Sequence, residues 1–168
     1  MKKPAALLVI LLGCALGGSL LAQDFTYVGA DKCQICHRTE SRGQQYPIWQ
    51  KSKHSLSFQA LSTPEAQKLA SDAPANVKCL GCHAPLADKA PELKAEGVTC
   101  EVCHGPGSEY KKLSLMKNKD EAVKNGLILY ANEEAVKAQC LKCHQNAHNK
   151  VFDFAAYWEK IKHAVPQK

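Results

Sequence analysis

The 168-residue chain contains 22 basic and 16 acidic residues, so its net charge is +6, and 45% of its residues are hydrophobic. This length and composition suit a single globular domain after any targeting segment is removed. The excess of positive charge is small and includes Lys2 and Lys3 at the N-terminus, so it does not argue for a nucleic-acid partner.

The first predicted element is an export signal over residues 1–22. Lys2 and Lys3 precede an almost wholly apolar run from Ala5 to Ala22, and polar residues follow. This pattern is typical of a secretory signal peptide cleaved after Ala22, and it predicts an exported, periplasmic protein. The alternative is lipidation at Cys14 or retention of the segment as an anchor, and only then do we expect membrane association. We expect residues 23–168 to form one domain.

Four later segments have helical patterns, with loops between them. Pro64 interrupts the first of these segments, and Thr63 suits the N-cap of a helix that begins at Pro64. Asn132 is likewise expected to cap the helix that follows it. The chain is therefore predicted to be mainly α with long loops and little β structure. The predicted helices cover residues 44–70 (broken at Pro64), 119–125, 132–139 and 154–163, and the predicted loops or turns cover 71–77, 84–97 and 105–107.

A Cys-x-x-Cys-His motif occurs four times. The two thiols of such a motif can add to the vinyl groups of one haem, and the His can then bind the iron as its proximal ligand. The alternatives, zinc binding or a disulfide, do not need a His after every Cys pair. The eight motif cysteines are all the cysteines except Cys14. Motifs one to four contain Cys33, Cys36 and His37; Cys79, Cys82 and His83; Cys100, Cys103 and His104; and Cys140, Cys143 and His144.

Four motifs predict four covalently bound haem c groups in a short chain. At this density the interior would consist largely of porphyrin, so we expect a compact multihaem cytochrome c fold organised around the four haems. Without Lys2 and Lys3 the chain has 20 basic and 16 acidic residues, a net charge of +4. Each ferric haem adds a charge of about −1 through its propionates, so four haems would cancel this charge.

The other side of each iron needs a distal ligand. Two segments, Trp49–His54 and Trp158–His163, share the pattern Trp-x-Lys-x-Lys-His, and we interpret both as helices that present His54 and His163 as distal ligands. His148 could serve a neighbouring haem, because it lies too close in sequence to His144 to bind the opposite side of the same iron. Three spare His allow at most three bis-His haems. The fourth iron would take Met116, another group, water or nothing.

In these features the chain resembles tetrahaem cytochromes of the cytochrome c-554 family. The resemblance covers nearly all of residues 23–168. It rests on the order of the motifs and of the segments between them. Motif one is followed by Trp49–His54 and then by motif two, and Gly97–Thr99 leads into motif three, which is followed directly by Gly-Pro-Gly. Motif four is followed by a C-terminal segment that ends in His163.

The resemblance implies a mainly helical periplasmic electron carrier with closely packed haems, three bis-His and one five-coordinate. It also implies that His54 and His163 serve motifs three and four. The family's founding member has a distal His shortly after the Gly-Pro-Gly turn, whereas residues 108–119 here contain only Met116. This leaves His148 and Met116 as rival ligands for motifs one and two.

The resulting hypothesis is a protein that transfers electrons between redox partner proteins, because irons with both axial sites filled do not bind substrate. The alternative is a small reductase of nitric oxide or another nitrogen oxide at one five-coordinate haem. The sequence shows no dedicated acid or base for such an enzyme. A haem-based sensor or a subunit of a larger assembly is a third interpretation.

Overall fold

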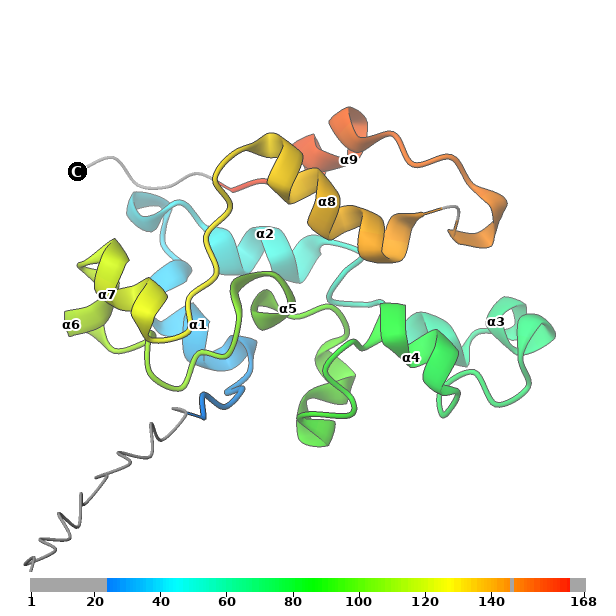
Figure 1. Cartoon of the computed structure of the whole chain (residues 1–168). Helices are drawn as coiled ribbons and strands as arrows, with labels where there is room; N and C mark the ends of the chain where they lie inside the picture. Colours follow the sequence, from blue (N-terminus) through cyan, green and yellow to red (C-terminus); the bar gives the residue numbers. More distant parts are fainter. Residues whose placement is uncertain (1–23, 146, 164–168) are drawn as a thin grey trace, which may run out of the picture.

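The computed structural model describes residues 24–145 and 147–163, and every regular element in these ranges is a helix (Figure 1). The predicted mainly α class with long loops is therefore confirmed. The predicted signal peptide, Cys14 and Pro166 lie outside the described residues. No helix within the described ranges is both long and apolar enough to cross a membrane.

The helices are short, and α8 is the longest of those described, with twelve residues. The α-helices are α1 Ala30–His37, α2 Gln45–Lys51, α3 Pro64–Leu69, α4 Val77–His83, α5 Cys100–His104, α6 Leu113–Met116, α7 Lys119–Lys124, α8 Glu133–His144 and α9 Phe154–Ile161; the 3-10 helices are η1 Glu40–Arg42, η2 Gln59–Ser62, η3 Pro91–Glu96 and η4 Ala147–Asn149.

The polypeptide itself buries little apolar surface. The buried apolar side chains of the described residues are mostly alanines, with Leu61, Leu86 and Tyr110 the larger exceptions. Large apolar side chains such as Ile35 and Val77, in two of the motif helices, are more than 70% exposed. A chain of this length ordinarily buries a larger core, so its interior suits large apolar groups packed between the helices.

Two predicted helix starts are confirmed. Thr63 accepts a hydrogen bond from the Ala66 backbone N–H at 3.3 Å, and Pro64 occupies the first turn of α3. Asn132 Oδ1 accepts from the Ala135 N–H at 3.0 Å, so it caps α8. Both side chains satisfy backbone donors that have no partner within the helix.

The predicted continuous helix from residue 44 to Pro64 is wrong. Helix α2 ends at Lys51, because the Ser52 hydroxyl donates to the Trp49 carbonyl at 2.7 Å and the Ser55 hydroxyl donates to the Gln50 carbonyl at 2.9 Å. Serine side chains that bond nearby carbonyls compete with the helical ladder. His54 therefore lies in a turn.

The predicted helical position of His163 is also wrong, because α9 ends at Ile161. Both segments of the repeated pattern share a helix that stops just before its His. The predicted loop over residues 84–97 contains the short helix η3.

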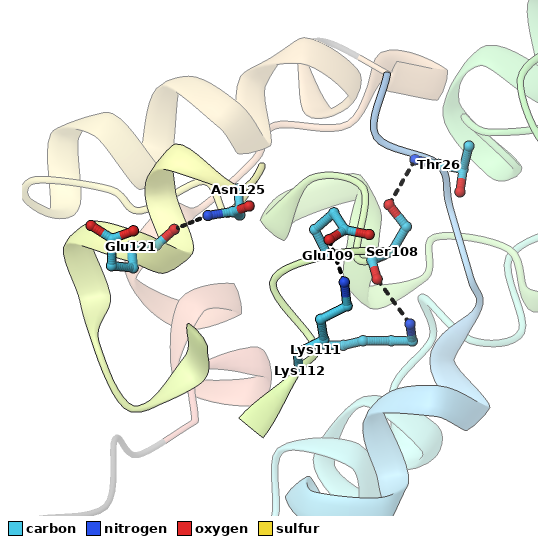
Figure 2. Close-up of polar contacts among 7 residues, drawn as sticks. All are labelled: Thr26, Ser108, Glu109, Lys111, Lys112, Glu121 and Asn125. Atoms are coloured by element: carbon cyan, nitrogen blue, oxygen red, sulfur yellow. Dashed lines mark hydrogen bonds and ion pairs between the residues drawn. The ribbon is translucent and has the colours of Figure 1, made fainter. Parts of the chain in front are cut away.

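The N-terminal part of the described chain is tied to the turn that follows α5. The Thr26 N–H donates to Ser108 Oγ at 3.1 Å, and the Ser108 N–H donates to the Thr26 carbonyl at 3.1 Å (Figure 2). Figure 2 also shows Lys111 donating to the Ser108 carbonyl, which closes the same turn. The segment leading into motif one is thereby held beside motif three.

Gly97 lets residues 97–99 lie directly against the turn that contains His54. The Val98 N–H donates to the His54 carbonyl and to Ser57 Oγ, both at 3.0 Å. Gly97 has a φ of +66°, and a Cβ there would lie 2.4 Å from Ser57 Oγ and 2.6 Å from the His54 carbonyl oxygen. The backbone conformation and the close approach both require glycine.

We predict that Gly97→Ala lowers the free energy of unfolding of the haem-loaded protein by more than about 1 kcal/mol, measured by urea denaturation. The control is Gly81→Ala, because a Cβ at Gly81 has no neighbour within 4 Å. The equivalent position of the other motifs carries Ile35, Val102 or Lys142. Equal stability losses in the two variants would contradict the proposed contact.

Candidate haem-binding sites

Each of the four motifs forms the end of a helix. His37, His83, His104 and His144 are the last residues of α1, α4, α5 and α8. Cysteines three positions apart on a helix lie on the same face, so both thiols of a motif can reach one planar group. All eight motif cysteines are free of disulfide bonds. Within the described ranges, no three side chains of His, Cys, Asp and Glu gather into a metal-binding cluster, so the zinc alternative gains no support.

Three of the four proximal His rings face one of the predicted distal His rings. Ring centres are 6.1 Å apart for His54 and His144, 6.1 Å for His83 and His148, and 5.8 Å for His104 and His163. Each pair joins parts of the chain that are distant in sequence or lie on different helices.

These separations fit two imidazoles on opposite sides of one metal ion. A metal–nitrogen distance of about 2.0 Å, as imidazole ligands have with zinc, and about 1.1 Å from nitrogen to ring centre give a separation of about 6 Å. Two rings in direct contact would stack closer together, as His144 and Phe152 do at 4.5 Å. The residues present therefore fit bis-His haems at motifs two, three and four.

His37 differs from the other proximal His. No ring contact between His37 and a second imidazole is found in residues 24–145 and 147–163, although His37 acts electrostatically on His104 and His163. Its Nδ1 lies 3.2 Å from Gln45 Oε1 at the start of α2. Met116 is half-buried at the end of α6, and no described contact joins it to His37. Met116 stays a predicted ligand, in rivalry with His148, for motifs one and two.

Ser57 contacts the predicted ligands of two different sites, a role that no sequence motif indicates. Its carbonyl oxygen lies 2.9 Å from His83 Nδ1, which leaves Nε2 of His83 free for a metal. Its hydroxyl donates to the carbonyls of His83 and His54, at 2.8 and 2.7 Å. Such partners of the non-coordinating nitrogen set the tautomer and the orientation of a ligating ring.

The repeated tryptophans have different surroundings. The Trp49 indole N–H donates to the Val98 carbonyl at 2.8 Å, and its ring lies 5.4 Å from that of Tyr46. Trp158 stacks on Phe154 at 6.1 Å, and no hydrogen bond of its indole is found among the described residues. Trp49 thus fixes the segment that carries His54 against residues 97–99.

Burial favours the neutral form of these imidazoles. It lowers the pKa of His54, and the adjacent His144 ring lowers that pKa further. Burial is also the main cause of the lowered pKa of His104. Neutral imidazole is the form that binds a metal, so both rings are prepared for ligation at neutral pH.

Contacts between cysteines give the spatial order of the motifs. The neighbouring Cys33, together with burial, raises the pKa of Cys100. Burial and the neighbouring Cys82 raise the pKa of Cys143 to about 11. Burial and the nearby Cys140 raise the pKa of Cys103 to about 11. The motifs therefore lie in the order one, three, four, two.

Motifs three and four are also joined by hydrogen bonds. The Gln139 side chain in α8 donates to the Val102 carbonyl at 3.1 Å, and the Tyr130 hydroxyl donates to the Cys103 carbonyl at 2.7 Å. Both contacts hold α8 against α5.

Comparison with known proteins agrees with these features. Residues 32–105, which contain motifs one to three, match the family described as cytochrome c554 and c-prime. A curated relative, cytochrome c-554 of Nitrosomonas europaea, is 25% identical over 150 residues, covering 77% of this chain and 62% of the relative. The chain thus spans about 62% of the length of this relative. No solved structure gives a significant match.

We predict that Trp49→Phe lowers the free energy of unfolding by about 1 kcal/mol or more, because the Val98 carbonyl loses its donor. Trp158→Phe is the matched control, because it removes the same side-chain volume and breaks no hydrogen bond found among the described residues. Urea denaturation of the two haem-loaded variants measures the difference. Equal losses would show that the indole hydrogen bond contributes nothing.

Proposed function

We propose that this chain, which matches the cytochrome c554 family over residues 32–105, binds four covalent haem c groups and relays electrons between redox partner proteins in the periplasm. Haem c supplies an iron that changes its charge by one electron. The chain supplies the thiols that fix each haem and the imidazoles that fill the axial positions.

The observation that carries this proposal is the set of three facing His pairs. Each pair places imidazoles at a separation suited to both axial positions of one iron. We assign His144 and His54 to motif four, His104 and His163 to motif three, and His83 and His148 to motif two. Filled axial positions leave no site for substrate, and this favours electron transfer.

His148 is the least expected of these distal ligands, and its backbone supports the assignment. It has a φ of +56°, in the left-handed region that L residues rarely adopt. Such conformations cost about 1–3 kcal/mol and concentrate at functional sites. Ligation of the motif-two iron would compensate for this cost.

The spatial order of the motifs supports a linear relay. Neighbouring motifs are joined through Cys33 and Cys100, through Cys103 and Cys140, and through Cys82 and Cys143. We therefore propose that electrons pass along the order one, three, four, two, or its reverse. Covalent attachment on helix ends keeps the distances between sites constant.

Motif one is the candidate for a second function. His37 has no described imidazole opposite it, so the proposed open iron belongs to motif one. A five-coordinate iron could bind nitric oxide or a related nitrogen oxide, and reductase activity there is the alternative function. Gln45, the described partner of the His37 ring, is not an acid, so it could not supply the proton that such a reaction needs.

We predict that His54→Ala, His148→Ala and His163→Ala each convert one low-spin haem to a high-spin haem, because each removes one axial ligand. Covalent haem content, measured by mass spectrometry, should remain four. Electron paramagnetic resonance of the ferric protein measures the spin states. A variant with unchanged spin states would contradict the assignment of that ligand.

Met116→Leu is the matched control, because it replaces the rival ligand without changing its approximate volume. It should leave all spin states unchanged. Carbon monoxide added to the reduced parent protein should bind to one haem in each chain. An absence of binding would show that the motif-one iron is six-coordinate, and a changed Met116→Leu spectrum would identify Met116 as its ligand.

A further inference from the structure

Motif three contains a buried carboxylate whose role goes beyond haem attachment. Glu101 lies between Cys100 and Cys103 and is only 2% exposed. It accepts hydrogen bonds from the backbone N–H groups of Gly107 at 2.6 Å, Gly29 at 2.8 Å and Val28 at 3.0 Å. All of these partners donate hydrogen bonds, and an ionised carboxylate, which only accepts, can accept from each of them.

A second carboxylate lies at the same place in the fold. Glu96 Oε2 accepts from the Ala30 N–H at 2.9 Å and from the Thr99 hydroxyl at 2.7 Å. Glu96 and Glu101 together satisfy three consecutive N–H groups, from residue 28 to residue 30, where α1 begins. Negative groups are stabilised at this end of a helix.

Neither carboxylate is neutralised by a cation in the part of the chain that the structure describes. The ion pairs found there join neighbouring residues of the surface segments: Lys112 with Glu109, Lys124 with Glu121, and Lys162 with Glu159. The negative charges of Glu96 and Glu101 therefore act on their surroundings.

Those surroundings are the attachment sites of motifs one and three. Helix α1 carries motif one and packs against α5, which is motif three. Cys33 and Cys100 are neighbours, and both carboxylates act electrostatically on Cys33. On the far side of motif three, Lys142 of motif four is the charged side chain that acts on Cys103.

We propose that Glu96 and Glu101 lower the reduction potentials of the haems held at motifs one and three, so that electrons run from this end of the relay toward motif two. The inference rests on the proposed tetrahaem relay. A fixed negative charge in a poorly solvated site stabilises the more positive oxidation state. Burial and nearby charge are established means of setting a haem potential.

The primary test is Glu96→Gln in the full haem-loaded chain. Both contacts of Glu96 use one oxygen, so the amide oxygen of glutamine can keep them while the charge is lost. We expect the potentials of the motif-one and motif-three haems to rise by about 59 mV, a tenfold change in a one-electron equilibrium. Motifs two and four should change much less.

Redox titration followed by electron paramagnetic resonance separates the sites. The high-spin signal of the parent reports motif one, and the additional high-spin signal in a His163→Ala background reports motif three. Glu134→Gln is the control, because it removes the same charge from an exposed position in the first turn of α8. It should shift no potential measurably in 0.15 M salt.

Glu101→Gln gives a second, stronger test. Its amide nitrogen would face backbone donors, so we expect lower stability together with a larger rise in the same two potentials. Unchanged potentials in Glu96→Gln, or equal shifts at all four haems, would overturn the inference. A parent protein with fewer than four haems would instead overturn the proposed function.

Discussion

Pairs of imidazole rings held about 6 Å apart connect parts of this chain that otherwise share few apolar contacts. His104 and His163 join α5 to the segment after α9, and His54 and His144 join the turn after α2 to the end of α8. The separation is too large for direct stacking and suits a shared iron, so under the proposed function the tertiary arrangement depends on ligation as well as on packing. The alanine-rich core agrees with this dependence, because the side chains alone bury little apolar surface.

Backbone hydrogen bonds keep the ligands in place where packing is sparse. Ser57 contacts both His83 and His54, and Gly97 allows the neighbouring segment to approach their carbonyls closely. The backbone of His148 also holds a ring in place, because this residue keeps a strained left-handed conformation where its ring faces His83. Ligand geometry in this fold is therefore set largely by residues that would not bind iron themselves.

The sequence predicted the features whose chemistry is local. Each of these features is contained in a few consecutive residues. They are the Cys-x-x-Cys-His motifs, the Thr63 and Asn132 caps, and the repeated pattern that ends in His54 and His163. Ser52 could have signalled the end of α2, because serines compete with helical hydrogen bonds. The facing of His148 and His83, by contrast, depends on contacts between distant segments. Glu101 occupies a position that the Cys-x-x-Cys-His pattern leaves unspecified, and only the fold shows which N–H groups surround it.

The small polypeptide core also has a consequence for how the protein is made. Under the proposed function, a chain that buries mostly alanines gains little from folding before its haems are attached, so its cysteines stay accessible until attachment. Folding then follows haem attachment, and chains without haem remain open to proteolysis. On this proposal, the amount of folded protein in a cell depends on haem supply as well as on translation.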